Sequence, residues 1–304
     1  MELLRNANFD FISKYRKGFM LSSILIVIGL IFLGMNAGPN FGIDFRGGVK
    51  IQAKFNRAVT ENELKEKLES LGFGRATIQV NAIQREASIS LGYSADFEAQ
   101  AGRDISEGLI EGSADWNALP QGVSVSAVGP SVGKDLKWAA LWSVLSSIVI
   151  LLAYISWRFE FRFAIGAIAA LIHDVLITLG VFSVLSKEIN LPTIAAFLTI
   201  IGYSLNDTIV VFDRIRENTL TLKGIEYSET LNRSINQSLS RTVITSLTTF
   251  FVVLVIFFLS SSGEEINTFA LALIVGVIIG TYSSIFVASP ILNLWNLKTR
   301  QSAA

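Results

Sequence analysis

Cysteine is absent from this sequence, and histidine occurs once, as His173. A chain without cysteine has no disulfide framework and no thiolate metal site. Lysine plus arginine and aspartate plus glutamate number 25 each, so the formal net charge is zero. This balance and an isoelectric point near 6.6 give no support to a nucleic-acid partner. We expect no metal site and no cofactor.

Charged residues are also scarce, at 16% of the 304 residues, whereas a soluble domain contains roughly a quarter. Hydrophobic residues make up 51%, and the mean hydropathy is +0.52. About 20 apolar residues allow a helix to cross roughly 30 Å of hydrocarbon. Six stretches have this character: 19–37, 138–157, 163–185, 191–212, 242–260 and 268–293. The sequence therefore predicts a mainly α membrane protein with six transmembrane helices.

The first apolar run follows basic residues, as the core of a secretory signal peptide does. It is longer than the roughly 7–15 residues of such a core, and MNAG, residues 35–38, is a poor cleavage site. We therefore expect residues 19–37 to be retained as the first transmembrane helix.

Basic residues gather in the connections on one side of the predicted bundle. These are Arg5, Lys14, Arg16 and Lys17 at the N-terminus, Arg158 and Arg162 between spans two and three, Arg214, Arg216, Lys223, Arg233 and Arg241 between spans four and five, and Lys298 and Arg300 in the tail. Cytoplasmic loops carry an excess of lysine and arginine, so both termini are expected in the cytoplasm. The predicted organisation is a cytoplasmic N-terminus (1–18), a first helix (19–37), an external domain (38–137), and five helices with a cytoplasmic C-terminus (138–304).

The external domain changes to short periodic elements. Strands are expected at 45–55, 76–80, 86–92 and 122–128, and helices at 60–72 and 94–112. Thr60 and Glu63 have the spacing of a capping box at the start of the first of these helices. The order βαββαβ predicts an α+β domain of the ferredoxin-like type. The open face or edge of its sheet is expected either to be exposed to water or to bind another polypeptide.

Two glycine-rich stretches have a superficial likeness to phosphate-binding loops. GPSVGKD, residues 129–135, has three residues between its glycines instead of four, and Asp135 follows the lysine where serine or threonine is required. FGIDFRGG, residues 41–48, is not followed by the helix of a dinucleotide fingerprint. We expect these glycines to allow close backbone approach at the membrane junction.

Two carboxylates fall inside predicted spans: Asp174, next to His173, and Asp207, next to Asn206. An ionisable residue at the membrane centre costs about 2.5–3.5 kcal/mol on insertion scales and suggests a function. Ser204 precedes Asp207 by three residues and shares its side of the helix. A buried carboxyl group can exchange a proton near physiological pH when burial and an arginine act on it in opposite directions. Asp207 is therefore a candidate proton-carrying site.

Span five begins near Arg241, which we expect to meet a carboxylate across the bundle. Hydroxyl residues follow it: Thr242, Thr245, Ser246, Thr248 and Thr249. The structural interpretation of these hydroxyls is hydrogen bonding between helices. The same structural role is open to His173 and, at a higher energetic cost, to the two aspartates.

An intramembrane aspartyl protease is an alternative, because paired carboxylates there share one proton. Such proteases set one aspartate in a Gly-x-Gly-Asp context. This sequence has Ser-Leu-Asn-Asp at residues 204–207, which disfavours the protease interpretation.

Five motifs follow one another along the chain: FGIDFRGG after span one, GPSVG before span two, HDV in span three, GYSLNDTIVVFDRIREN in span four and NQSLSRTVITSLTT into span five. In this order they resemble the SecF members of the SecD/SecF family of bacterial protein-export membrane proteins, within the resistance–nodulation–division superfamily. The resemblance runs through nearly the whole chain.

The resemblance implies a non-enzymatic subunit of the bacterial inner membrane with a periplasmic domain at 38–137. It implies a heterodimer with SecD, association with the SecYEG channel and the translocating polypeptide, and use of the proton or sodium gradient late in export. YajC and YidC are further implied partners.

Residue by residue, the resemblance implies an ion pathway through Asp207 and Arg241. Supporting positions are Asp174, Asn206, Ser204 and His173. The remaining motif positions have an implied structural role: Gly42, Asp44, Arg46, Gly47, Gly48, Gly129 and Gly133.

Two other functions stay open. A static scaffold or assembly factor would need the spans and the external domain, but no ionisable residue at position 207. A small-molecule exporter half of the same superfamily would usually carry far larger external domains than the roughly hundred residues found here.

Overall fold

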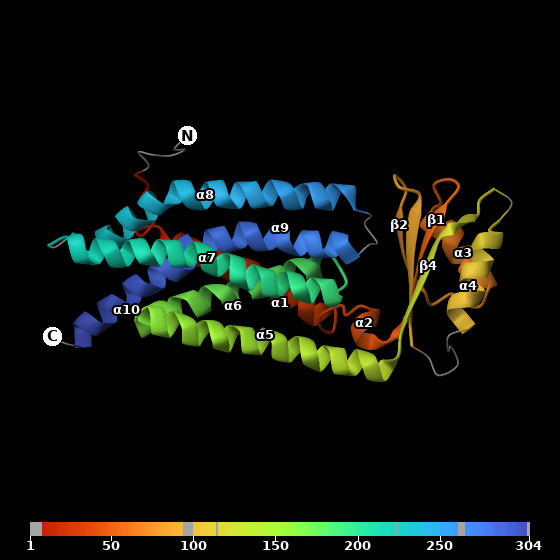
Figure 1. Ribbon diagram of the computed structural model, residues 1–304, viewed down its shortest axis with the longest axis horizontal. Helices are drawn as coiled ribbons and strands as arrows, with labels where there is room; N and C mark the ends of the chain where they lie inside the picture. Colours follow the sequence, from red (N-terminus) through yellow and green to blue (C-terminus); the bar gives the residue numbers. More distant parts are fainter. Residues whose placement is uncertain (1–7, 94–99, 114, 223, 261–264, 303–304) are drawn as a thin grey trace.

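A computed structural model describes residues 8–93, 100–113, 115–222, 224–260 and 265–302. Long helices form an elongated bundle, and a small α+β domain lies at one end of it (Figure 1). The C-terminal helix lies at the opposite end of the bundle (Figure 1).

Within the described residues, six helices are long and apolar enough to cross a membrane. They are α1 (Tyr15–Met35), α5 (Pro130–Arg158), α6 (Phe161–Val184), α7 (Leu191–Thr221), α8 (Tyr227–Leu259) and a composite helix from Glu265 to Leu297. The composite consists of α9 (Glu265–Ser283), the π-helical turn η1 (Ser284–Ala288) and the first part of α10 (Ser289–Ser302). Each helix overlaps one predicted span, so the prediction of six membrane helices is confirmed.

Helices α7 and α8 extend well beyond the apolar stretches. Hydrophobicity predicts an end near residue 212 and a start near 242, but the helices continue to Thr221 and begin at Tyr227. Ion pairs one helical turn apart support these polar ends: Arg214 with Glu217 and Arg233 with Glu229, each at 2.8 Å. Apolar length marks the part that crosses the membrane, whereas the helix itself continues into polar residues.

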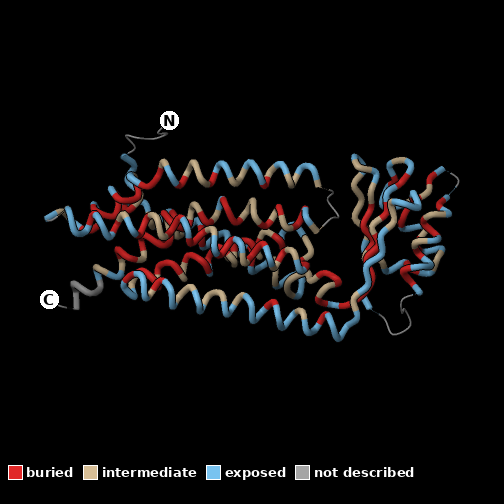
Figure 2. The backbone as a smooth tube through the Cα atoms, in the orientation of Figure 1, coloured by how far each residue is buried: buried red, intermediate tan, exposed pale blue. Residues whose placement is uncertain are grey.

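Helices α6, α7 and α9 form the interior of the bundle, while α5 and the C-terminal half of α8 are mostly exposed or half-buried (Figure 2). Half or more of the most apolar segments of α6, α7 and the composite helix is buried, against 6% for α5 and 17% for α1 and α8. The exposed side chains on the apolar segments of α5 and α8 are largely apolar, as contact with lipid requires.

Glycine sets a very close contact between α1 and α6. A Cβ added at Gly29 would lie 2.6 Å from the Cα of Gly180, and one at Gly180 would lie 2.8 Å from the Cα of Gly29. Small residues at such crossings let membrane helices approach and gain van der Waals contact. Neither backbone leaves room for a larger residue.

The small domain has four strands and two covering helices. The strands are β1 (Gly48–Phe55), β2 (Thr77–Asn81), β3 (Glu86–Gly92) and β4 (Ala118–Val128), and the helices are α3 (Glu61–Ser70) and α4 (Gln100–Glu111). Every pair is antiparallel and the order is β2-β3-β1-β4, which confirms the ferredoxin-like prediction. Thr60 and Glu63 form the predicted capping box. Residues 94–99 of the predicted second helix lie outside the described residues.

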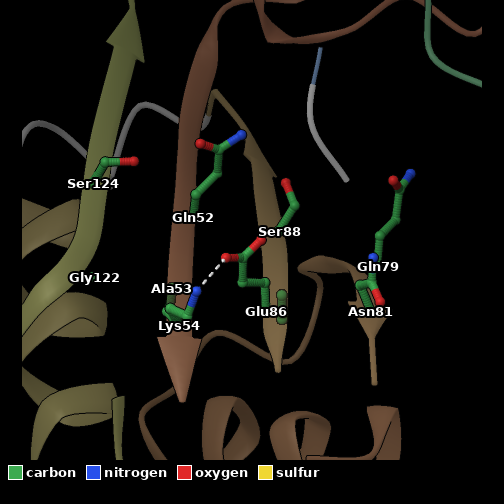
Figure 3. A pocket seen from close by; sticks show the side chains of 10 residues that line it. Gln52, Ala53, Lys54, Gln79, Asn81, Glu86, Ser88, Gly122 and Ser124 are labelled. Carbon is green, nitrogen blue, oxygen red and sulfur yellow. Dashed lines mark hydrogen bonds and ion pairs between the residues drawn. The ribbon is translucent and has the colours of Figure 1, made fainter. Parts of the chain in front are cut away.

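One sheet face packs on α3 and α4 through an apolar core that includes Ile51, Leu64, Ile89 and Ile105. The other face is polar and turned toward the bundle (Figure 1). A hollow of about 160 Å³ lies on this face, and Figure 3 shows its side chains. They include Gln52, Lys54, Gln79, Asn81, Glu86, Ser88 and Ser124. Amides and hydroxyls dominate, which suits hydrogen bonding rather than acid–base chemistry.

The two glycine motifs meet where the domain joins the bundle. A Cβ on Gly47 would lie 2.9 Å from the Cα of Pro130, and a Cβ on Gly133 would lie 3.1 Å from the nitrogen of Gly47. Gly47 has φ of 76°, which also favours glycine. Gly129 is the N-cap residue of α5 and has no atom near its missing Cβ.

The residues before β1 correct one prediction. Residues 43–46 form a short helix, α2 (Ile43–Arg46), so the strand expected from residue 45 begins at Gly48 instead. Asp44 Oδ2 accepts a hydrogen bond of 2.7 Å from the backbone nitrogen of Leu191, at the start of α7. The nitrogen of Gly42 donates to the carbonyl of Ile189 at 2.8 Å. These bonds tie the FGIDFRGG motif to the connection between α6 and α7.

Enlarging Gly29 tests the close helix crossing. We expect Gly29→Val to destabilise the bundle by about 1–3 kcal/mol, because overpacking forces the backbones apart. The melting temperature in detergent micelles should fall by several degrees.

Gly34→Val is the matched control, since a Cβ there meets no atom within 4 Å and the position lies on the same helix. Equal melting temperatures for the two variants would contradict the close crossing of α1 and α6.

Candidate functional site

Asp207 lies in α7, with 2% of its surface exposed, where α7, α8 and α9 meet. Its Oδ2 accepts a hydrogen bond from Ser246 Oγ of α8 at 3.2 Å. Ser246 Oγ in turn lies 2.6 Å from Thr281 Oγ1 of α9. This carboxyl group is therefore connected to both neighbouring helices through hydroxyl groups.

Small residues of α9 bring this helix against α7 beside the site. A Cβ on Gly276 would lie 2.2 Å from the Ile200 side chain, and a Cβ on Gly280 would lie 3.0 Å from the Cβ of Ser204. Ile200, Ser204 and Asp207 follow one another at helical spacing, so they share the face that α9 covers. The absence of side chains on the two glycines lets α9 lie within hydrogen-bonding reach of this face.

Asp174 of α6 is the second buried carboxylate, with 1% of its surface exposed. Its Oδ2 accepts hydrogen bonds from Ser204 Oγ at 2.6 Å and Ser283 Oγ at 2.9 Å. Its Oδ1 lies 2.8 Å from His173 Nδ1. Asp174 thus gathers side chains from α6, α7 and α9.

His173 continues this network to α1. Its Nε2 lies 2.9 Å from Ser22 Oγ, which lies 3.1 Å from the Tyr282 hydroxyl. Tyr282 donates its proton to the carbonyl of Gly18 at 2.7 Å. Ser22 must then donate to Tyr282 and accept from the Nε2–H of His173.

The proton count fixes the charge of the histidine–aspartate pair. With Nε2 protonated, Nδ1 of His173 either donates to the Asp174 carboxylate or accepts the proton of a neutral carboxyl group. In both arrangements one proton is shared between the two side chains. The pair therefore carries no net charge, which suits its burial.

The two carboxyl groups differ in their charge partners. Asp174 has an imidazole beside it, whereas Asp207 accepts a hydrogen bond from the hydroxyl of Ser246. Arg241 is exposed, and within the part of the chain that the structure describes no ion pair joins it to Asp207. Among the described residues, the expected ion pair of Arg241 with Asp207 is therefore not formed. Arg241 precedes Ser246 by five residues, about 140° around the helix, so the two point in different directions.

Four of the six predicted pathway residues lie buried around the two carboxyl groups: His173, Asp174, Ser204 and Asp207. Asn206 is exposed on α7, and Arg241 is exposed on α8. The structure therefore separates the Asn206–Asp207 pair, since adjacent residues on a helix point about 100° apart.

Span five contains a partial correction. Thr245 donates to the carbonyl of Arg241, Thr248 to that of Ile244 and Thr249 to that of Thr245, at 3.0–3.1 Å and within α8. The expectation that these threonines bond between helices is wrong, because a helical threonine can reach the carbonyl one turn before it. Ser246 does bond to other helices.

Sequence reasoning missed four participants: Ser22, Thr281, Tyr282 and Ser283. Three of them belong to the polar run TYSS, residues 281–284, which interrupts span six where η1 begins. That interruption is the signal that could have found them. π-helical turns frequently occur at functional sites.

The protease alternative receives no geometric support. Asp174 and Asp207 have different hydroxyl partners, and no hydrogen bond between the two carboxyl groups is present among the described residues. A dyad sharing one proton needs its two carboxyl groups in contact. Across the same residues, no group of three or more histidine, cysteine, aspartate or glutamate side chains could hold a metal ion.

Charges outside the membrane part link the small domain to α9. Lys50 of β1 pairs with Glu265, the first residue of α9, at 3.5 Å. Glu188, between α6 and α7, lies near the same charges. Burial raises the pKa of Glu188, while Lys50 and Arg46 act to lower it. The helix that borders both carboxyl groups thus begins at a contact with the domain.

The sequence matches a known protein family. Residues 113–298 match the family described as "Protein export membrane protein SecD/SecF, C-terminal", and residues 32–59 match the "SecD/SecF GG Motif". The protein translocase subunit SecF of Calditerrivibrio nitroreducens is 44% identical over 298 residues, covering 97% of this chain and 96% of the relative. That of Vibrio alginolyticus is 41% identical and covers 91% and 86%.

Solved structures of SecDF are also similar. The crystal structure of SecDF from Thermus thermophilus has a TM-score of 0.83 and 37% identity, covering 97% of this chain. SecDF in its super-membrane-facing form has a TM-score of 0.70 at the same 37% identity. The chain spans only 40% of either SecDF chain. With a family match over more than half its length and relatives above 40% identity along nearly all of it, the chain belongs to the SecD/SecF family of protein-export membrane proteins.

Proposed function

We propose that this chain is the SecF-type half of an ion-driven export machine in the bacterial inner membrane. It pairs with a SecD half, associates with the SecYEG channel and uses the proton or sodium gradient to promote late steps of polypeptide export. The observation that carries this proposal is Asp207, a carboxyl group buried among three helices, with a hydroxyl in contact and, among the described residues, no ion pair to a cation.

The energetics favour ion exchange at Asp207. A lone carboxylate in a low-dielectric interior is unstable, and binding a proton removes its charge. One elementary charge that crosses 100 mV supplies about 2.3 kcal/mol. Loading and unloading Asp207 from opposite sides of the membrane could therefore drive a change between two helix arrangements.

A path for mechanical coupling follows α9. This helix contacts the surroundings of Asp207 through Thr281 and those of Asp174 through Ser283. At its other end, Glu265 pairs with Lys50 of the small domain. A shift of α9 at the carboxyl groups would thus reach the domain that we place next to the emerging polypeptide.

The distribution of basic residues supports the orientation. The connections at the domain end carry few lysine and arginine residues, and those at the other end carry many. We therefore place residues 38–137 in the periplasm and both termini in the cytoplasm.

A strip of small and polar residues on α7 suits the SecD half. Thr199, Gly202 and Asn206 are exposed within the apolar part of the helix. Small residues permit close packing between membrane helices, and an amide in contact with lipid would lack partners. YajC, YidC and the channel contacts rest on family resemblance alone.

Two alternatives fit less well. A static scaffold has no functional need for a buried carboxyl group at Asp207, whose burial is energetically unfavourable. A small-molecule exporter half would need a larger external domain than this single ferredoxin-like unit. Both predict export that is insensitive to Asp207.

Neutralising Asp207 tests the proposal. In vesicles containing the SecD partner, SecYEG and ATP, we expect Asp207→Asn to remove the gradient-dependent share of reporter export. The ATP-driven share should persist, because asparagine fills nearly the same volume and the complex still assembles.

Asp213→Asn is the matched control on the same helix, since Asp213 is 48% exposed and pairs with Arg158 at 3.6 Å. Gradient-dependent export that survives in Asp207→Asn vesicles would favour the scaffold.

The shared proton of His173 and Asp174 predicts strong energetic coupling. In a double-mutant cycle with His173→Ala and Asp174→Ala, the interaction energy in unfolding should be about 1–3 kcal/mol, since each single change strands a buried polar partner. A parallel cycle of His173→Ala with Asp207→Ala should show much less. Additive effects in the first cycle would argue against the pair.

Thiol crosslinking tests the α7 surface without background, because the chain contains no cysteine. A photoreactive group attached at Gly202→Cys should form an adduct with SecD. Val149→Cys on α5, where Val149 is 63% exposed, should give lipid adducts only. SecD adducts from position 149 and only lipid adducts from position 202 would instead indicate that SecD binds at α5.

A further inference from the structure

Three hydrogen-bond contacts around Asp207 are served by only two hydroxyl groups, those of Ser246 and Thr281. Thr281 Oγ1 lies 2.7 Å from the carbonyl oxygen of Val277 and 2.6 Å from Ser246 Oγ. Ser246 Oγ also lies 3.2 Å from Asp207 Oδ2. Each hydroxyl has a single proton, so the three contacts hold three protons only when Asp207 supplies one.

When Asp207 is ionised, the two hydroxyl protons must serve three contacts, so one contact is left without a proton. Ser246 donates to the carboxylate, because a hydrogen bond to a charged group is the strongest of the three. Thr281 donates to Ser246, because two hydroxyl oxygens 2.6 Å apart need a proton between them, and the Val277 carbonyl then lacks the threonine proton. When Asp207 is protonated, its O–H donates to Ser246, Ser246 donates to Thr281, and Thr281 donates to Val277. Protonation thus reverses both hydroxyls.

We propose that Ser246 and Thr281 are positioning residues that form a two-hydroxyl relay, which reports the protonation state of Asp207 to the backbone of α9. The inference rests on the proposed function of Asp207 as an ion-exchanging group. It assigns to these hydroxyls a role that family membership does not supply.

Because Thr281 lies in α9 close to η1, the relay can change the geometry of that helix. A threonine that bonds the carbonyl four residues earlier tends to bend a helix, so gaining or losing the Thr281–Val277 bond changes the local geometry. The π-helical turn η1 begins three residues later, at Ser284. Ser283, between them, donates to Asp174 at 2.9 Å. A change in α9 at Thr281 therefore reaches the second carboxyl group directly.

The relay also explains why hydroxyls stand beside Asp207. A hydroxyl can donate to a carboxylate and accept from a carboxyl group, whereas a lysine or arginine can only donate. Hydroxyls therefore satisfy Asp207 in both protonation states. A permanent cation in contact would favour the ionised state alone.

Infrared difference spectroscopy of the full chain in lipid nanodiscs, between acidic and neutral buffer, tests the relay. The carbonyl band of protonated Asp207 is identified as the band that Asp207→Asn removes. We expect this band to move in Ser246→Ala and in Thr281→Val, because the chain of acceptors is broken. It should stay in place in Thr281→Ser, which restores the hydroxyl.

Export in vesicles provides the second readout. The gradient-dependent share should fall roughly tenfold in Thr281→Val, as expected for losing one buried hydrogen bond, and should recover in Thr281→Ser. Thr248→Val is the matched control, because the Thr248 hydroxyl bonds only carbonyls of its own helix in the structure.

The outcomes separate the relay from the proposal on which it rests. A band that Asp207→Asn removes but that Thr281→Val and Ser246→Ala leave unmoved would overturn the relay and leave ion exchange at Asp207 intact. A spectrum with no such band in the natural chain would overturn ion exchange at Asp207 itself. A moved band in Thr248→Val would also overturn the relay, since any lost hydroxyl would then have the same effect.

Discussion

Inside the hydrocarbon layer no water is available to hydrogen-bond a carboxyl group, so neighbouring helices must supply its hydrogen bonds. Asp174 and Asp207 both need such partners, and α9 contributes to each. Ser283 of α9 is hydrogen-bonded to Asp174, and Thr281 of α9 is connected to Asp207 through Ser246. The arrangement of α6, α7 and α9 as the buried interior follows from this need. Gly276 and Gly280 allow α9 to pack closely against α7, because a side chain at either position would crowd Ile200 or Ser204 of α7.

The two carboxyl groups solve the problem of burial differently. Asp174 shares a proton with His173 and is neutral as a pair, while Asp207 stands among hydroxyls that accept either of its charge states. A neutral pair suits a fixed support that holds α1, α6, α7 and α9 together. A lone acid suits a group whose charge changes. This division is consistent with membership of a protein-export family and with the proposed use of an ion gradient.

The small domain depends on the same helix. Glu265 at the start of α9 pairs with Lys50, and the glycine motifs bring β1 against the first turn of α5. The polar open face of the sheet therefore lies at one end of the bundle, turned toward the helices (Figure 1). The start of α9 is in direct contact with this domain through the Lys50–Glu265 pair.

The sequence alone determined the six membrane helices, the βαββαβ domain and the two buried aspartates, because apolar length, strand and helix periodicity and the scarcity of charge are local properties. It also pointed to Ser204 and His173, which lie within one turn of an aspartate. Only the tertiary structure decided that Arg241 and Asn206 face outward and that Ser22, Thr281, Tyr282 and Ser283 face the carboxyl groups. Hydroxyl side chains are inexpensive anywhere in a membrane helix, so their presence in a sequence does not say what they touch. Their partners lie on other helices, and helix packing alone fixes those distances.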